Sequence, residues 1–239
     1  MQLVPGLIAA ALTVVAVAPA QVGAQRQSSV DSLQAEFHQP QYFWQQLEVA
    51  KRLVSAGDRR AIELVEPFVT HEDRHLRGNA AYVLAGLGEA RGFDVLAAIL
   101  TDRSERSIGQ GIPGGNMTVG RQITADRYYA VHLLGELGNR RAVDVLVPLL
   151  ADAEVNYKVA WALGKIGDPR SIRPLISALD DSDALVRVGA IQALAELRAA
   201  EALPKLQELL NDNELPSAGD RVPVAHTARA AIARLQAAR

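Results

Sequence analysis

The sequence predicts an all-α solenoid of about five repeats. One spacing recurs: a residue that ends a helix is followed fourteen positions later by a turn residue, usually acidic. The pairs are Gly57 and His71, Gly88 and Asp102, Gly138 and Asp152, Gly167 and Asp181, and Arg198 and Asp212. Apolar residues make up 49% of the chain and aromatic residues only 5%, and Ala and Leu, both frequent here, are strong helix formers. Helical units that return about every 30 residues are typical of a solenoid.

Residues 1–24 are predicted to be a signal peptide. They carry no charged side chain, and the apolar run 7–18 has the length of a signal-peptide core. Small residues at alternate positions then predict cleavage near Ala20 or Ala24, so we expect a periplasmic or secreted bacterial protein. The alternative is an uncleaved membrane anchor, although the run is shorter than the about 20 residues that a spanning helix needs. Residues 25–41 are polar and predict a flexible lead-in.

The repeat domain, residues 42–237, begins with an extra helix over 42–55 and continues with two helices per repeat. First helices are expected at 58–70, 90–101, 139–151, 168–180 and 199–211. Second helices are expected at 74–87, 125–137, 154–166, 184–197 and 223–235. Gly88, Gly138 and Gly167 lie where a left-handed residue ends a helix. Asp168 before Pro169 predicts an N-cap followed by Pro at the first helical position.

Two motifs resemble HEAT repeats. Val186 and Arg187, followed by Ala190, match the Val-Arg-x-x-Ala signature, and residues 162–169 are similar to the short HEAT-like repeats of phycobilisome lyases. The resemblance implies a right-handed α-α superhelix whose Arg-bearing helices line the concave side. It also implies a ladder of turn acids and arginines, interrupted where Asn156 and Ala225 replace Arg. The matching positions are Asp102, Asp152, Asp181, Asp212, Arg77, Arg127 and Arg187.

The concave face is the first candidate binding surface. Tyr82, His132 and Trp161 recur at equivalent positions of three successive repeats, and Tyr and Trp are enriched at binding hot spots. The candidate residues are Tyr82, Tyr128, Tyr129, His132, Tyr157, Lys158, Trp161 and Gln192. Glu136 and Glu196 mix with the lysines, which favours a protein or peptide partner. The alternative is that these aromatic residues only fill packing space between repeats.

The insertion 103–123 is the second candidate surface. It contains Gly-Ile-Pro-Gly-Gly-Asn, and an insertion at one place in a repeat projects from one edge of a solenoid. We expect a binding loop that uses Ile112, Asn116 and Met117. Long surface loops are also thermodynamically tolerated, so a loop without function is the alternative.

His71-Glu72-Asp73-Arg74-His75 spells the H-E-x-x-H zinc motif. That chemistry requires both His side chains on one helical face. The repeat register instead places His71 in a turn, and the sequence suggests no third ligand. We therefore expect neither a metal site nor a cofactor.

The remaining patterns exclude several functions. The chain has no Cys, and its net charge of -2 is unlike the basic stripe of a nucleic-acid-binding protein. No nucleotide-binding loop or serine-hydrolase elbow occurs. HEAT-like deoxyhypusine hydroxylases use several paired His-Glu sites, whereas only one His-Glu pair occurs here. We expect an exported scaffold or adaptor that is not an enzyme and is not stably inserted in a membrane. The alternatives are a bilin-lyase-related or metal-dependent catalytic subunit and a structural spacer.

Overall fold

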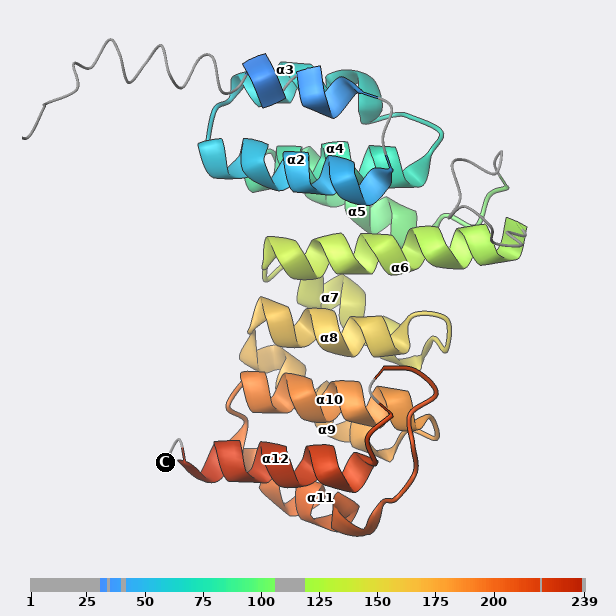
Figure 1. Ribbon diagram of the computed structural model, residues 1–239, viewed down its shortest axis with the longest axis vertical. Coiled ribbons are helices and arrows are strands. Elements are labelled where there is room, and N and C mark those ends of the chain that lie inside the picture. The colour runs from blue at the N-terminus through green and yellow to red at the C-terminus, as the bar shows by residue number, and fades with distance from the viewer. Residues whose placement is uncertain (1–30, 34, 40–41, 106–118, 220, 238–239) are drawn as a thin grey trace, which may run out of the picture.

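The described part of the chain is a stack of helix pairs. The structure is a computed structural model that describes residues 31–33, 35–39, 42–105, 119–219 and 221–237. All regular structure within these ranges is helical. The front helices in Figure 1 are α2 (Phe43–Ala56), α6 (Val119–Leu137), α8 (Asn156–Ile166), α10 (Ala184–Glu196) and α12 (Val224–Ala237), and α4 (Arg74–Gly86) lies behind α2. The first helices of the repeats are α3 (Arg60–Val65), which lies at the top of Figure 1, and the rear helices α5 (Ala90–Thr101), α7 (Ala142–Leu146), α9 (Ile172–Ser177) and α11 (Leu203–Glu208). The prediction of an all-α solenoid with about five repeats is confirmed.

Most rear helices are interrupted by 3-10 turns. These are η1 (Glu66–Phe68), η2 (Val147–Ala151), η3 (Pro169–Ser171), η4 (Ala178–Asp180), η5 (Ala200–Ala202) and η6 (Leu209–Asn211). Pro67 and Pro148 each stand near the start of such a turn. Proline lacks the amide hydrogen that an α-helix uses, so the tighter turn suits these positions. α5 contains no proline and runs unbroken over its predicted range.

The predicted helix ends are confirmed by the backbone. Gly88, Gly138 and Gly167 all have φ between 63° and 89°, the left-handed region that favours glycine. Arg198 takes the same position with φ 53°. Asp168 accepts a hydrogen bond from the Arg170 amide at 2.9 Å, as its predicted capping role requires.

The second helices stack through a column of small and aliphatic residues. Leu84, Leu134, Leu163 and Leu194 are fully buried at equivalent positions, and each such side chain stabilises the fold by about 1.5–3 kcal/mol. Glycine allows the backbones to approach beside this column. A Cβ atom added at Gly164 would lie 2.9 Å from Ala193 Cα, so α8 and α10 meet with no room for a side chain there.

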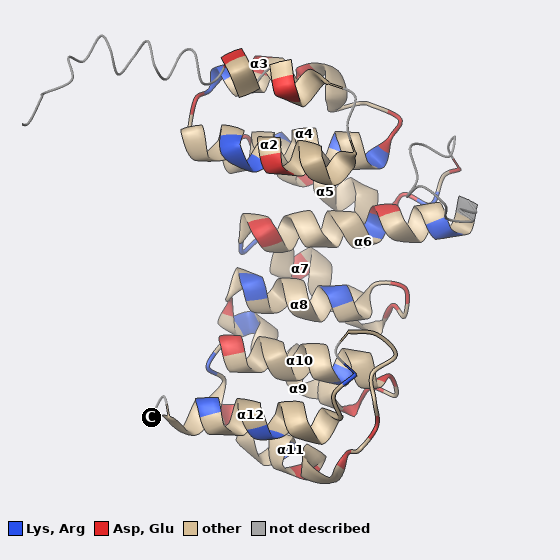
Figure 2. Cartoon of the chain, in the orientation of Figure 1, with Lys and Arg blue, Asp and Glu red and all other residues tan. Residues whose placement is uncertain are grey.

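The acidic turns lie along one edge of the stack (Figure 2). Three arginines each bind the turn acid of the following repeat. Arg77 binds Asp102 at 3.2 Å, Arg127 binds Asp152, and Arg187 binds Asp212 at 2.9 Å. Asn156 interrupts this ladder as predicted, since its side-chain carbonyl accepts the Tyr157 amide. The hydrogen bond from Arg127 holds the pKa of Asp152 below its usual range.

α2 does more than cover the end of the stack. It packs on α4 and also reaches α6, where Lys51 Nζ lies 3.2 Å from Glu136 Oε2. The residues before it differ from the expected flexible lead-in: 31–33 and 35–38 are helical, and Phe37 is fully buried against Phe68. The apolar Leu33 and Phe37, set in a polar segment, are both buried in the core.

α6 begins six residues earlier than predicted, at Val119 instead of Ala125. Its first turns contain a buried network in which Gln122 donates to Asp126 at 2.8 Å, and Arg74 of α4 binds the same carboxylate at 3.0 Å. These tertiary contacts stabilise a segment expected to be loop. The predicted loop residues Ile112, Asn116 and Met117 lie outside the described residues.

Among the described residues, the helices are too short or too polar to cross a membrane. The predicted signal peptide, residues 1–24, lies outside the described ranges.

Candidate functional site

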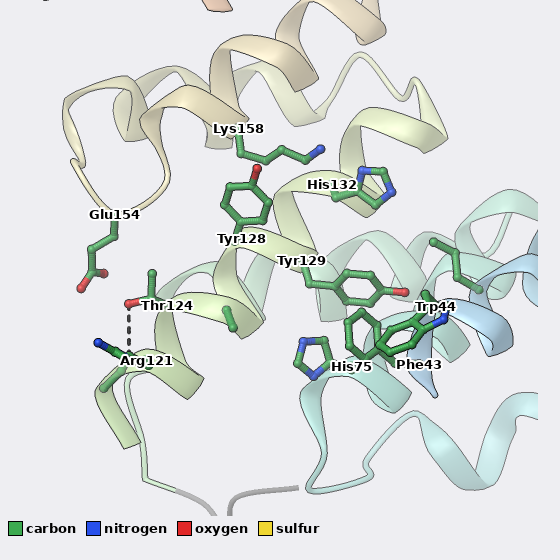
Figure 3. A pocket seen from close by; sticks show the side chains of 13 residues that line it. Phe43, Trp44, His75, Arg121, Thr124, Tyr128, Tyr129, His132, Glu154 and Lys158 are labelled. Carbon is green, nitrogen blue, oxygen red and sulfur yellow. Dashed lines mark hydrogen bonds between the residues drawn. The ribbon is translucent and has the colours of Figure 1, made fainter. Parts of the chain in front are cut away.

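An aromatic cavity opens on the face formed by the second helices (Figure 3). Its volume is about 780 Å³, within the range of small-molecule sites. α6 supplies one long wall, α2 and α4 supply the opposite wall, and α8 with its preceding turn closes one end. The lining residues are Phe43, Trp44, Leu47, His75, Gly120, Arg121, Thr124, Ala125, Tyr128, Tyr129, His132, Glu154 and Lys158.

The rings of Phe43, His75 and Tyr129 form the floor of the cavity. Phe43 stacks on His75 with centroids 4.2 Å apart, and its edge meets Tyr129 at 4.7 Å. Trp44 lies 5.1 Å from Phe43 and is 42% exposed, so it forms part of the rim. Aromatic rings that line a cavity suit a flat, conjugated ligand.

Buried hydrogen bonds fix the floor in place. The Tyr129 hydroxyl donates to Asn79 Oδ1 at 2.6 Å, and Asn79 Nδ2 donates to the Phe43 carbonyl and to Gln46 Oε1. Burial raises the pKa of Tyr129 well above its usual range, so its hydroxyl remains a donor at neutral pH. The network joins α2, α4 and α6, and therefore holds the cavity open in one shape.

Lys158 and Arg121 give the cavity a cationic side. Lys158 Nζ lies 3.5 Å from the Trp161 ring centroid and 5.5 Å from that of Tyr128. Burial lowers the pKa of Lys158 to about 8, so the amine is mostly charged at pH 7. Glu154 is already paired with Arg103 and Arg127. The Lys158 ammonium can thus bind a carboxylate of a ligand.

A smaller groove of about 470 Å³ continues toward α12. Trp161 separates it from the cavity, because its ring stacks on His132 at 5.0 Å and also lines the groove. Burial, and then the charge of Lys158, lowers the pKa of His132 to about 4, so this imidazole is neutral. Gln192 is exposed in the groove, with Glu196 and Arg234 nearby.

The structure brings together most of the predicted concave-face residues. Tyr128, Tyr129, His132 and Lys158 line the cavity, whereas Trp161 and Gln192 line the groove. Tyr157 packs against Gly189 between repeats. Tyr82 differs from the expectation: it is only 7% exposed and does not line the cavity, because α2 packs on α4 at this point.

Sequence reasoning missed Phe43, Trp44 and His75. Two adjacent aromatic residues, 43 and 44, at the start of a helix outside the repeats were the sequence signal that could have indicated this part of the site. The sequence suggested a role for His75 only within the zinc motif. His71 lies in a turn, as predicted, and its Nδ1 accepts a hydrogen bond from the Asp73 amide. α4 begins after it, at Arg74. Among the described residues, His, Asp and Glu form no cluster suited to a metal ion.

The stacked helix pairs and the Arg–Asp ladder define an α-solenoid. Comparison with protein families identifies its class: HEAT repeats match residues 124–186 and 151–218. Residues 124–218 therefore match the HEAT-repeat family, and the resemblance noted in the motifs is confirmed.

Relatives of known name fall in two groups. The chain is 32% identical over 142 residues to the bilin biosynthesis protein PecE of Nostoc sp. PCC 7120, a match to 58% of this chain and 51% of the relative. It is 30% identical over 112 residues to deoxyhypusine hydroxylase of Schizosaccharomyces pombe, which covers 45% and 33% of the two chains. The chain thus spans about half or less of these relatives.

Among solved structures, the complex of CpcE and CpcF of phycocyanin lyase from Nostoc sp. PCC 7120 is similar. The TM-score is 0.51 at 26% sequence identity, over 74% of this chain and 65% of that chain. These matches correct the prediction that the chain is not an enzyme, because the relatives include a named hydroxylase and a lyase component. They favour the alternative of a catalytic subunit related to bilin lyases.

Proposed function

We propose that this chain is a subunit of bilin-lyase type that holds an open-chain tetrapyrrole in the aromatic cavity. The carrying observation is the cavity itself: a slot of about 780 Å³ with rings on its floor and cations on one side. Such a pigment is flat, conjugated and carries two propionate groups, so its rings match Phe43 and Tyr128 and its carboxylates match Lys158. The relation to PecE supports this ligand class.

The floor would select for planarity. Phe43, His75 and Tyr129 are held by packing and by the Asn79 hydrogen bonds, so little ordering is needed when a ligand enters. A preorganised site loses less conformational entropy on binding. The exposed Trp44 and Tyr128 would close over the pigment from opposite rims.

The test is a titration with biliverdin, a commercially available open-chain tetrapyrrole, followed by its induced circular dichroism. We expect saturation at one pigment per chain, with a dissociation constant in the micromolar range. This corresponds to a binding free energy of about -8 kcal/mol. Tyr128→Ala should weaken binding about tenfold, whereas Tyr157→Phe, on the inter-repeat side, should not. No induced signal from the wild-type chain would refute the proposal.

The cationic side is tested with the dimethyl ester of biliverdin, which lacks both charges. Lys158→Met should reduce affinity for biliverdin about tenfold, since a charge-assisted hydrogen bond contributes about 1.5–3 kcal/mol. The same variant should bind the ester as the wild type does. Equal losses for both ligands would assign Lys158 a packing role only.

A protein partner is the second part of the proposal. The similar structure is a complex of two chains, and the groove with Trp161, Gln192 and Arg234 offers a mixed polar and aromatic surface. Gln192→Ala combined with Arg234→Ala should abolish co-purification of a partner while the induced pigment signal is retained. Partner retention by this double variant would exclude the groove.

Export and the edge loop remain proposals that rest on sequence. Uncharged residues 1–24 support export, which N-terminal sequencing of the mature chain would test: a start at residue 21 or 25 is expected. Replacement of 104–118 with a short turn tests the loop, and unchanged partner binding would remove its assigned role.

A further inference from the structure

His75 is paired with a buried carboxylate beneath the aromatic cavity. Its Nδ1 atom lies 3.4 Å from Asp126 Oδ1 on α6 and 3.6 Å from Asp73 Oδ1. Asp126 is fully buried and is also held by Arg74 at 3.0 Å and by Gln122 at 2.8 Å. The carboxylate is therefore fixed in position beside the Nδ1 edge of the imidazole ring.

The second ring nitrogen of His75 is directed differently. Within the described residues, His75 Nε2 makes no hydrogen bond, and this atom is not fully shielded from solvent. His75 lines the cavity, so Nε2 is the nitrogen available to a ligand. A histidine with one nitrogen on a buried carboxylate and the other open to a site is the arrangement used for proton transfer.

We infer that His75 is a proton donor and acceptor for the ligand in the aromatic cavity, with Asp126 as its positioning residue. This inference rests on the proposed tetrapyrrole site. In the forward step the Nε2–H bond of the imidazolium breaks, and a new N–H bond forms on a pyrrolenine nitrogen of the pigment. The positive charge moves to the conjugated pigment, and the reverse step returns the proton. No oxidant, reductant or further reactant is needed.

The charges around His75 favour this role. Asp73 precedes it on the N-terminal side of α4, and Asp126 faces it from α6, so two carboxylates lie beside Nδ1 of the ring. Arg74 opposes them but is itself paired with Asp102 and Asp126. Phe43 from α2 and Tyr129 from α6 contribute rings and no ionised group at neutral pH. Because the site is partly shielded from water, these interactions are stronger than on the surface.

The test reads the protonation state of bound biliverdin from its long-wavelength absorption band, which intensifies and shifts to the red when the pigment is protonated. Wild type, His75→Gln and His226→Gln are titrated from pH 5 to pH 10 with the pigment bound. His226 is exposed on α12, far along the chain from the cavity, and serves as the matched control. We expect the pH midpoint of the pigment to fall by about one unit or more in His75→Gln and to remain unchanged in His226→Gln.

The induced circular dichroism of the same samples separates the outcomes. A normal induced signal with an unchanged midpoint in His75→Gln would overturn this inference and leave the proposed function standing. No induced signal in the wild type would overturn both. If His75→Gln fails to fold, nitrogen-15 chemical shifts of His75 in the wild type decide: a change at Nε2 on addition of biliverdin is expected, and no change there refutes proton exchange.

Discussion

Phe43 on α2 stacks on His75 of α4 with ring centroids 4.2 Å apart and planes inclined by 21°. This contact attaches the extra N-terminal helix to the first repeat and at the same time builds the floor of the cavity. α2 is therefore part of the site as well as a cover for the end of the stack. Changes at Phe43 should affect stability and ligand binding together.

Phe43→Ala should lower the free energy of unfolding by about 3 kcal/mol, because a packed ring is replaced by a cavity. It should also weaken biliverdin binding at least tenfold, since one wall of the slot is removed. Urea unfolding and the induced circular dichroism titration measure the two effects. Leu215→Ala, at a 47% exposed position, should change neither. Full ligand affinity in Phe43→Ala would show that α2 is not part of the site.

Gly164→Ala tests the close approach of α8 and α10. The added Cβ would lie 2.9 Å from Ala193 Cα, so the helices must separate, and we expect a loss of about 1–3 kcal/mol in unfolding free energy. Gly120→Ala is the matched control, since nothing lies within 4 Å of the added atom. It should be neutral or stabilising by up to about 1 kcal/mol, because alanine is the better helix former. Equal effects of both changes would contradict the packing described.

Arg127→Met tests the Arg–Asp ladder. Arg127 is 2% exposed and binds Asp152, Glu154 and the Leu100 carbonyl. Its removal leaves acceptors without a partner at the junction of two repeats, so we expect a loss of about 3 kcal/mol in urea unfolding. Arg91→Met removes an exposed pair with Glu66 and should leave the melting temperature almost unchanged. A small effect of Arg127→Met would show that the ladder contributes little to the free energy of unfolding.

Lys158 predicts a pH dependence of stability. Burial lowers its pKa in the folded chain to about 8 from the ordinary 10.5. Between these values the unfolded chain binds more protons at this position, so the unfolding free energy contributed by Lys158 rises as the pH rises from about 8 to 10.5. Urea unfolding at pH 7.5 and pH 10 should show this rise, and Lys158→Met should reduce it. Lys165→Met, at an exposed position of the same helix, is the control.

The same titration predicts the opposite trend for the ligand. As Lys158 loses its charge above pH 8, affinity for biliverdin should fall, whereas affinity for the dimethyl ester should not. A parallel fall for both ligands would trace the effect to some other group.

The repeat architecture could be predicted from sequence because its signals are local. Left-handed Gly138 and Gly167, the Asp168 cap and the leucine column each act within one or two turns of helix. Their fixed spacing determines which helices are neighbours in the stack. The interruption of the ladder at Asn156 followed from the resemblance to HEAT repeats.

The cavity could be predicted only in part. Tyr128, Tyr129, His132 and Lys158 follow from the repeat register, but Phe43 and Trp44 belong to a helix outside the repeat, whose packing partner no periodicity specifies. The same helix buries Tyr82. The early start of α6 depends on Asp126 meeting Arg74 from another repeat, a contact of long sequence separation that local patterns do not encode.

The most direct test of the proposed tetrapyrrole site is a crystal structure of the chain with biliverdin bound. We expect electron density for the pigment between Phe43 and Tyr128, with a propionate group within hydrogen-bond distance of Lys158 Nζ. Density for the pigment at any other place, with the aromatic cavity filled only by water, would contradict it.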